Sequence, residues 1–472
     1  MSSFDSEFSG DEFYNEASNL NEEIKKCKDN IRCGGVYGCT ENIEELVQLC
    51  LENDRIEDGL YFIELLLDSF PYNAEYWLKK GSLLIAVGEY VDAISCFDKS
   101  LSLNPGDSDT YLEKATAEES LGLLEDAKES LRTILDSEPN NEEAYFELGL
   151  LFQKEEKYKE AIECFRKTLE IDHTFSEAFY EMGFCFESLQ NYEEALKVYE
   201  NYLDLEPYSA SAWYNRGIVL GKMNMLEKAL ESYDFALAIK EEFGSAWFNK
   251  GNALADLGRF RQAIDCFKKS LELDKFDEAS AYNIANIYEE LGDLVNAIKY
   301  YTEAVKINDE YYEAFLSRGY CYDATGKFQL ALRDFNKAIS LSKDNFEAWY
   351  AKADLEYSLG KLKEAIASYR EALKLEADNF ELWSNLGETL FEVGDWLEAL
   401  NAFNICIKIN PADASAYYNK AKINFILSRT QEAVECLKKA FKIDPNIKIE
   451  FAKEYPEIKS SRLFKKLIGE TE

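Results

Sequence analysis

Proline and histidine are scarce in this sequence. The chain has 472 residues, of which seven are proline and one is histidine. Little proline, together with 47% hydrophobic and 30% charged residues, excludes a collagen-like or intrinsically disordered chain. The single histidine, His173, leaves almost nothing for histidine-based catalysis or histidine-rich metal sites. The composition therefore predicts an ordered chain whose function does not rest on histidine chemistry.

Long apolar runs and positive charge are also lacking. No stretch of 18 residues is free of charged side chains, so we expect no transmembrane helix. Residues 1–20 contain five acidic residues and neither Lys nor Arg, which does not fit a secretory signal. The chain has 52 Lys and Arg residues and 90 Asp and Glu residues, which gives a formal net charge of −38. Such a chain repels a phosphate backbone, so we expect neither membrane insertion nor a nucleic-acid partner.

The few prolines that are present follow a fixed period. Six of them are separated by 34, 34, 68, 204 and 34 residues, all multiples of 34: Pro71, Pro105, Pro139, Pro207, Pro411 and Pro445. A fixed period of this length is typical of solenoids and repeat arrays. With Thr40 as position 1, twelve repeats fill residues 40–447 without an insertion or deletion.

Other residue types obey the same frame. Position 20 is Ala in eleven of the twelve repeats, position 8 is Gly in seven and Ala in four, and position 15 is Gly in seven. Five of the six Trp residues stand at position 4. Positions 4, 7, 8 and 11 share one face of a helix, so each large side chain lies beside a small residue that admits a second helix. Glycine at position 15 is typical of the end of the first helix, and proline at position 32 follows the second.

These small, aromatic and proline positions resemble the tetratricopeptide repeat family over about nine-tenths of the chain. The resemblance implies an all-α fold, a right-handed superhelical α-solenoid of antiparallel helix pairs, with a groove lined mainly by the first helix of each repeat. The sequence departs from the pattern at position 32 in six repeats. The first repeat also departs from it, because it has Val47 at position 8 and Gly59 at position 20, and we expect it to be a terminal cap.

Two segments flank the predicted array. Residues 1–39 are interpreted as an acidic, flexible segment in which Phe4, Phe8, Phe13 and Tyr14 are interspersed; a docking motif, for a partner or for the chain's own basic end, is the alternative. Residues 448–472 are interpreted as a C-terminal capping helix and tail, with a membrane-surface helix as the alternative. Neither piece has room for an enzyme domain.

The eleven cysteines do not predict disulfides or a metal site. Four of them, Cys96, Cys164, Cys266 and Cys436, recur at position 23, as small apolar packing residues do. Cysteines in different repeats cannot pair systematically, which favours a reducing, cytoplasmic location. Cys27, Cys33 and Cys39 are spaced by six residues, whereas zinc ligands are usually two to four apart. No phosphate-binding glycine loop is present either, so we expect no metal, no cofactor and no catalytic residue.

The candidate site is a second stripe on the first helices, at positions 2, 5, 9, 12 and 13. In the resembling family this stripe faces the groove, and in this sequence it carries aromatic and acidic residues together with Asn at positions 6 and 9. Asn offers both a donor and an acceptor to an extended peptide backbone. The predicted partner-binding residues are Phe146, Tyr180, Phe184, Glu187, Tyr214, Asn215, Phe248, Asn249, Asn252, Asp256, Tyr282, Asn283, Asn286, Glu289, Tyr320, Asp323, Tyr350 and Asp354.

The chemistry of this stripe predicts the kind of partner. Its basic members are few, namely Lys154, Lys222 and Lys422. The family's best-known carboxylate clamp uses basic residues, so an acidic stripe favours a basic peptide or protein surface with apolar anchors instead. The alternative is that the aromatic residues only pack between neighbouring helices. Charge is also uneven: residues 1–200 hold 46 acidic and 17 basic residues, whereas residues 401–472 hold 9 and 13.

The sequence therefore predicts a non-enzymatic, cytoplasmic adaptor or scaffold that binds a protein or peptide. The alternatives are a co-chaperone or assembly factor that holds a basic client, and a regulatory subunit of an enzyme complex. The oligomeric state is not predicted by any residue pattern.

Overall fold

The computed structural model describes residues 21–29 and 40–455. Residues 1–20, 30–39 and 456–472 lie outside the described part. The chain divides into two compact units, residues 1–240 and 241–472, and each is described by itself. In each unit the described residues form helices and no strands.

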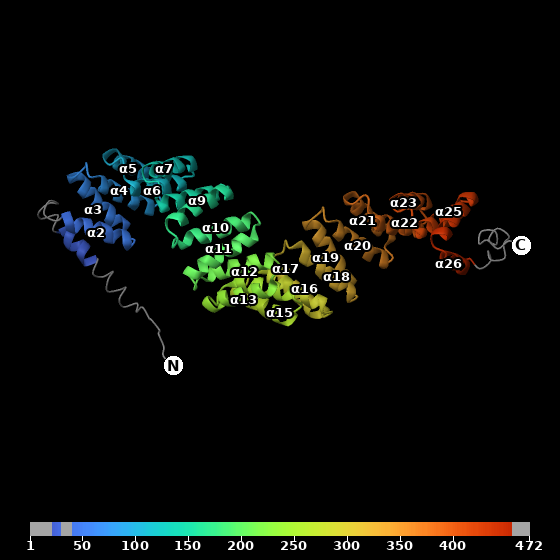
Figure 1. Ribbon diagram of the computed structural model, residues 1–472. Coiled ribbons are helices and arrows are strands. Elements are labelled where there is room, and N and C mark those ends of the chain that lie inside the picture. The colour runs from blue at the N-terminus through green and yellow to red at the C-terminus, as the bar shows by residue number, and fades with distance from the viewer. Residues whose placement is uncertain (1–20, 30–39, 456–472) are drawn as a thin grey trace. The chain divides into compact units, whose positions relative to one another are not determined.

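The first unit contains six helix pairs that follow one another along the chain. Figure 1 labels most of their helices. A helix over residues 21–29 precedes them. The helices are α2 (Thr40–Glu52), α3 (Ile56–Ser69), α4 (Ala74–Ala86), α5 (Tyr90–Leu103), α6 (Ser108–Ser120), α7 (Leu124–Ser137), α8 (Glu142–Lys154), α9 (Tyr158–Ile171), α10 (Ser176–Ser188), α11 (Tyr192–Leu205), α12 (Ala210–Lys222) and α13 (Leu226–Ile239).

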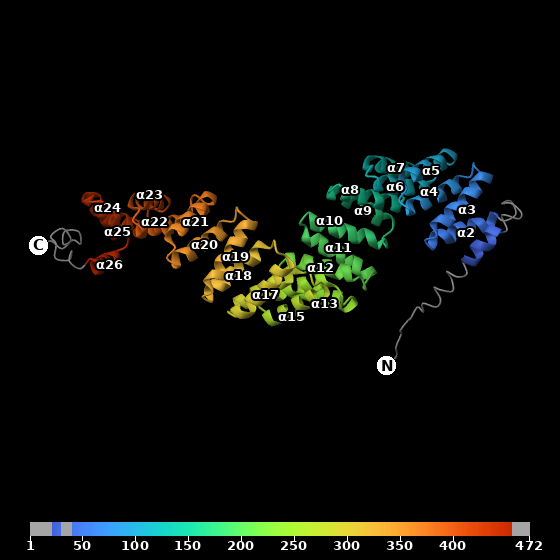
Figure 2. The ribbon, with the colours of Figure 1, turned by 180° about the vertical axis from the view of Figure 1, so that it is seen from behind.

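The second unit contains six further pairs and one short terminal helix, and Figure 2 shows the same pairing from behind. They are α14 (Gly244–Asp256), α15 (Phe260–Leu273), α16 (Glu278–Glu290), α17 (Leu294–Ile307), α18 (Tyr312–Ala324), α19 (Phe328–Leu341), α20 (Phe346–Ser358), α21 (Leu362–Leu375), α22 (Phe380–Val393), α23 (Trp396–Ile409), α24 (Ala414–Ile426), α25 (Thr430–Ile443) and α26 (Ile447–Glu454). The first helix of each pair is called helix A and the second helix B. The predicted all-α fold of paired helices is confirmed.

The turn between helices A and B has a left-handed residue at position 15 in all twelve repeats. Seven of these residues are glycine, for example Gly258 with a φ of 70°. The other five are Asp54, Glu156, Gln190, Asn224 and Ser428, with φ between 55° and 61°. A side chain at positive φ is strained, so the helix pair imposes this conformation where glycine is absent.

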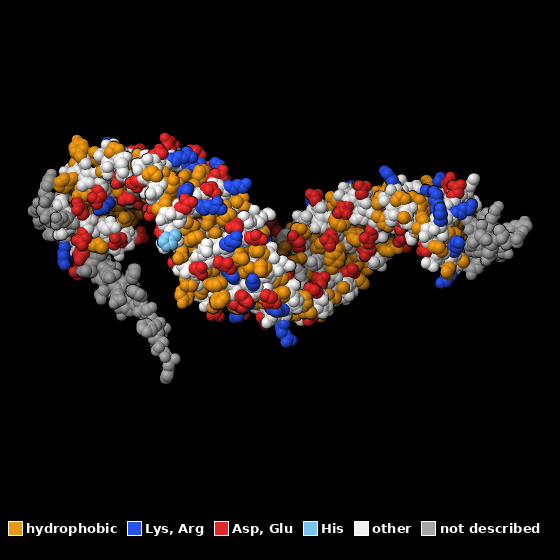
Figure 3. All heavy atoms as spheres, in the orientation of Figure 1, with side chains coloured by type: hydrophobic (Ala, Val, Ile, Leu, Met, Phe, Trp, Pro, Cys, Tyr) orange, Lys and Arg blue, Asp and Glu red, His pale blue; other side chains and the backbone are white. Residues whose placement is uncertain are grey.

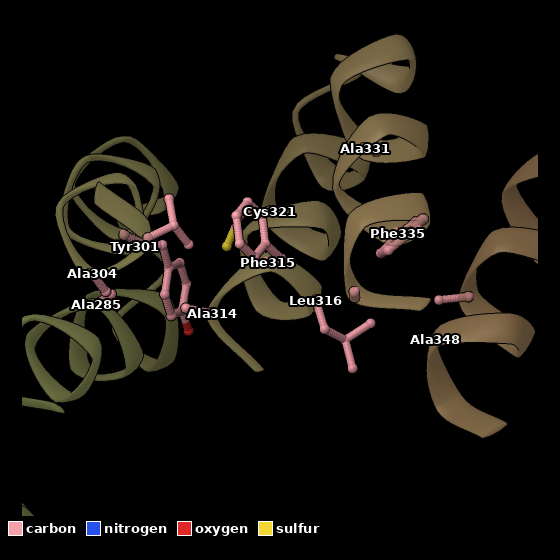
Figure 4. Packing of buried hydrophobic residues seen from close by; sticks show 14 of the residues in the cluster. Ala285, Tyr301, Ala304, Ala314, Phe315, Leu316, Cys321, Ala331, Phe335 and Ala348 are labelled. Carbon is pink, nitrogen blue, oxygen red and sulfur yellow. The ribbon is translucent and has the colours of Figure 1, made fainter. Parts of the chain in front are cut away.

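The contact between the two helices of a pair is made by one small and one large residue. A Cβ atom added to Gly251 on α14 would lie 2.7 Å from the Phe267 ring on α15, and one added to Gly319 would lie 2.5 Å from Phe335. Ala263 and Ala331, at position 20, are fully buried. Figure 4 shows this mixture of small and large side chains in the cluster that contains Ala331 and Phe335. The predicted packing face is confirmed.

The tryptophans at position 4 also fix the connection between repeats. Each indole Nε1 donates to the backbone carbonyl six residues earlier, at position 32. The distances are 2.9 Å for Trp77 to Pro71 and 2.7 Å for Trp383 to Ala377. Any residue provides a backbone carbonyl. Proline at position 32 is therefore dispensable, as Ala377 shows.

Short helices pack on both ends of the array. In the helix over residues 21–29, Ile24 and Cys27 are buried in one cluster with Val47 and Cys50. In α26, Ile447 and Phe451 are buried, and Phe451 contacts Tyr418 and Phe441. These contacts cover apolar surface that a terminal repeat would otherwise expose.

Candidate partner-binding surface

The aromatic residues at position 5 lie over the core rings of their own repeats. In the first unit, the ring centroids are 5.6 Å apart for Phe146 and Phe165, and 6.0 Å apart for Tyr180 and Tyr199. Phe146, Tyr180 and Tyr214 are half-buried. Each of these rings therefore packs on helix B and still keeps part of its surface accessible.

The second unit repeats this arrangement. The ring of Phe248 lies 5.6 Å from Phe267, and Tyr282 lies 5.6 Å from Tyr301. The ring of Tyr350 lies 6.3 Å from Tyr369. The residues at position 9 differ from one another: Tyr320 lies 5.4 Å from Phe335, whereas Phe184 in the first unit is 43% exposed. The packing role that the sequence left as an alternative is thus real, and it coexists with exposed ring surface.

The asparagines form hydrogen bonds between neighbouring repeats or within one repeat. Asn215 Nδ2 donates to the Tyr180 hydroxyl over 3.0 Å, and Asn283 Nδ2 donates to Asn252 Oδ1 over 3.1 Å. Asn286 Oδ1 accepts from the Tyr301 hydroxyl over 2.6 Å. Each of these bonds uses one of the several hydrogen bonds that an amide can make. Asn215 and Asn283 are thus oriented by a neighbouring repeat, and Asn286 by helix B of its own repeat.

Asn385 is one of the asparagines that recur at position 6, but it was not among the predicted partner-binding residues. Asn385 Nδ2 donates to the Tyr350 hydroxyl over 3.2 Å, which repeats the Asn215–Tyr180 bond with the same separation of 35 residues. The signal was present in the sequence, because Asn385 stands at position 6 and follows a repeat with Tyr at position 5.

The acidic members of the stripe carry charge that bases only partly balance. Burial raises the pKa of Asp323, and burial together with Asp323 and Glu381 raises that of Asp354. Burial also raises the pKa of Glu187, although Lys222 opposes the shift. Asp256 is exposed, and a Glu289 carboxylate oxygen lies 2.5 Å from the Tyr301 hydroxyl oxygen. Burial makes the negative charge costly for Asp323, Asp354 and Glu187, so a cation beside them would be favoured.

Glu147, on α8, is a further acidic residue that the sequence did not single out. Burial, with contributions from Glu119 and Glu143, raises its pKa to about 7. Glu147 stands at position 6, where other repeats have Asn. Its pKa depends on carboxylates from two repeats, and the sequence pattern does not reveal that proximity.

Two of the three basic residues of the stripe are already paired. Lys154 Nζ lies 3.0 Å from a Glu119 carboxylate oxygen, and Lys422 Nζ lies 3.0 Å from one of Glu454. The Lys154 pair removes one base and one acid from the stripe, since Glu119 stands at position 12, whereas Glu454, the partner of Lys422, lies outside the stripe. Figure 3 shows acidic and hydrophobic side chains next to one another over α18–α20 of the second unit.

Family models for the tetratricopeptide repeat match most of the array. The matched residues are 84–148, 142–175, 177–207, 210–243, 244–277, 280–311, 312–345 and 414–447, and a TPR repeat model matches 353–394. Most of these boundaries coincide with the 34-residue frame. The chain belongs to the tetratricopeptide repeat family. Proteins of this family are generally non-enzymatic scaffolds for protein–protein interactions.

Several solved tetratricopeptide repeat structures are similar. YrrB, described as having an unusual peptide-binding site, is 24% identical, covers 40% of this chain and 98% of its own, and has a TM-score of 0.38. The C-terminal part of a repeat protein from Cytophaga hutchinsonii is 20% identical, covering 51% and 99%, with a TM-score of 0.46. The Cut9–Hcn1 structure is 14% identical, covering 91% and 95%, with a TM-score of 0.35. No curated protein matches the chain. The family assignment rests on the repeat models.

Three other kinds of feature concern the described residues of this tetratricopeptide repeat chain: reactive cysteines, metal sites and membrane-spanning helices. The nine cysteines of the described residues are buried, among them Cys27; Cys33 and Cys39 lie outside the described ranges. Burial raises the pKa of Cys164 to about 11, so its thiol stays protonated. Over residues 21–29 and 40–455, no group of His, Cys, Asp and Glu has a geometry that could hold a metal ion. No helix in these ranges is long and apolar enough to cross a membrane.

Proposed function

We propose that this tetratricopeptide repeat chain is a cytoplasmic, non-enzymatic adaptor that binds a basic peptide or protein segment with apolar anchors along the helix A stripe. The observation that carries the proposal is the stripe on α18 and α20, where half-buried Tyr320 and Tyr350 lie beside Asp323 and Asp354. Burial raises the pKa of both aspartates, and the charges of Asp323 and Glu381 raise that of Asp354 further. A lysine or arginine placed here would gain a partner, and its aliphatic neighbours would gain a ring to pack against.

The hydroxyl groups on this stripe are already oriented. Tyr350 donates to a Glu381 carboxylate oxygen over 2.9 Å and accepts from Asn385. A surface whose polar groups are fixed before binding loses less conformational entropy when a ligand arrives. This favours a site for an extended segment, whose backbone the asparagine amides would meet.

The test uses the full chain and a random peptide library displayed on phage. We expect enriched peptides to carry net positive charge and at least one large apolar residue. The double variant Asp323→Asn, Asp354→Asn should weaken their binding at least tenfold without loss of thermal stability, because both changes remove a carboxylate and keep its shape. The matched control is Asp265→Asn with Glu364→Gln, which removes two exposed charges from helices B.

Enrichment of neutral or acidic peptides would contradict the proposal. Equal loss of binding in the control would show that only the net charge of the chain matters, and would also contradict a site at this stripe.

A further inference from the structure

The last repeat has a basic surface on its second helix, α25, outside the stripe described above. Repeat 12 contains six basic and three acidic residues, the largest excess of positive charge in any repeat of this chain. The three basic residues of α25 are all exposed: Lys438, Lys439 and Lys442, at positions 25, 26 and 29. In no other repeat are these three positions all basic. Figure 3 shows Lys and Arg side chains gathered over α25.

In three other repeats, an ion pair neutralises the corresponding place. Positions 26 and 29 are one turn apart on helix B and hold opposite charges in repeats 4, 7 and 10. The pairs are Lys167–Glu170 at 2.5 Å, Lys269–Glu272 at 2.9 Å and Lys374–Glu371 at 2.6 Å. In repeat 12 both positions are Lys, and none of the three lysines of α25 forms an ion pair with the described residues.

These like charges are unfavourable for the helix that carries them. Lys439 and Lys442 repel each other at a spacing of i, i+3, and Lys438 and Lys442 do so at i, i+4. The helix dipole favours a cation in the last turn, which of the three lysines holds Lys442 alone. The dipole therefore does not account for the whole set, and a carboxylate from another molecule would relieve the repulsion.

The surface also contains an apolar residue and a lysine in a defined position. Lys439 Nζ lies 5.5 Å from the centre of the Tyr417 ring on α24, which orients this side chain. Ile443 follows Lys442 directly, stands one turn beyond Lys439 and is 40% exposed. The last two turns of α25 thus present three ammonium groups together with one aliphatic side chain. An acidic segment that carries an apolar residue matches both features.

The charges nearby favour a short segment over a large anionic surface. Glu432 and Glu435 are exposed on the first half of α25. Repeat 11, which precedes this repeat, has six acidic residues and one basic residue. A bilayer or a long phosphate backbone would extend over these carboxylates and be repelled by them. A short protein segment can lie on the last two turns of α25 alone.

We propose that the end of α25, formed by Lys438, Lys439, Lys442 and Ile443, is a docking surface for a short acidic segment of a partner protein that carries an apolar residue. This surface is on helix B, and the charge that it selects is opposite to the charge selected by the stripe on helix A. The two surfaces are therefore independent, and each is tested with its own ligand.

The experiment measures the fluorescence anisotropy of a labelled peptide of Glu and Leu on titration with the full chain. We expect saturable binding that is weakened by added NaCl, and no binding of a peptide with Gln in place of Glu. Lys442→Glu copies position 29 of repeats 4 and 7, so it should melt like the parent and lower the affinity at least tenfold. The matched control is Lys363→Glu, at an exposed position of α21, which should leave the affinity within twofold.

A second pair of variants separates the surface from the net charge and from the groove. Ile443→Ala should lower the affinity by about threefold, because an apolar contact is lost while every charge remains. Asp323→Asn with Asp354→Asn should bind the acidic peptide like the parent, so a failure of this surface is distinguishable from a failure of the groove.

Three results would overturn the proposal. The first is an acidic peptide that does not bind. The second is an equal loss of affinity for Lys442→Glu and Lys363→Glu, which would show that only the net charge matters. The third is binding of phosphatidylserine vesicles or duplex DNA that is tighter than peptide binding and is lost in Lys442→Glu, because the surface would then serve a membrane or a nucleic acid.

Discussion

At the scale of single residues, the fold depends on the absence of a Cβ atom where the two helices of a pair meet. Gly251 and Gly221 both lie inside helices A, yet their surroundings differ. An added Cβ at Gly251 would meet the Phe267 ring at 2.7 Å, whereas at Gly221 the nearest atom, the Tyr233 hydroxyl oxygen, is 3.9 Å away. The same substitution should therefore have opposite effects at the two sites.

Gly251→Ala should lower the free energy of unfolding by about 1–2 kcal/mol, because the cost of overpacking exceeds the gain in helix propensity. Gly221→Ala should raise it by about 0.5–1 kcal/mol, since only the propensity changes. Urea denaturation followed by circular dichroism measures both. Equal effects at the two positions would contradict the packing described for position 8.

Glu147 should make stability depend on pH. Its pKa is raised to about 7 in the folded chain, from an ordinary value of 4.5, so the folded state holds a proton that the unfolded state loses. Stability is therefore highest below the unfolded pKa and decreases as the pH rises from about 4.5 through 7.

Glu147→Gln should remove this loss. At pH 8 we expect the free energy of unfolding of the variant to exceed that of the parent by on the order of 1 kcal/mol, since solvent screening reduces the full effect. This difference in stability should shrink toward pH 4.5. Thermal melting across this pH range measures the difference. Glu160→Gln, an exposed change on α9, controls for net charge, and a pH-independent gain for Glu147→Gln would contradict the assignment.

At the scale of the helix, A and B helices begin differently. Eight helices A have a side-chain cap from the last residue of the preceding repeat, as Asn345 accepts from the Ala348 backbone N–H over 2.9 Å. Most helices B, such as α21 with Lys361 at its N-cap, have no side-chain cap. Since helix B follows a three-residue turn that its partner helix holds in place, it needs less local capping.

Asn345→Ala should lower the free energy of unfolding by about 1 kcal/mol, because one backbone N–H loses its acceptor. Lys361→Ala, at the N-cap of the next helix, should change it by much less. Chemical denaturation of the two variants tests the difference. A similar loss for both would show that the Asn345 bond contributes nothing specific.

At the scale of the whole molecule, each repeat contacts chiefly its neighbours, so stability is local. Phe451→Ala in α26 removes a buried ring that contacts Tyr418, Phe441 and Tyr455. We expect faster amide hydrogen exchange in α24 and α25, by at least tenfold, and unchanged exchange in the helices of the first unit. Mass spectrometry of the exchanged chain measures this. Uniform acceleration along the whole chain would contradict a solenoid with local coupling.

The sequence by itself determined the helix pairs, their boundaries and their packing face. These features depend on residues within one 34-residue repeat, and twelve copies of the same pattern reinforce each other. The turns at the position 15 glycines could also be predicted, because a left-handed residue ends helix A there. The position 5 aromatics could likewise be placed on helix A from their spacing alone.

Only the tertiary structure decided what those side chains contact. The Asn215–Tyr180 bond joins residues 35 apart, and the Trp383 indole reaches a carbonyl of the preceding repeat. Glu147 has its raised pKa because it is buried and because carboxylates of two repeats lie near it. The physical reason is common to all three. A periodic pattern fixes where a residue lies on its own helix, whereas burial, pKa and open space depend on what the next repeat brings against it.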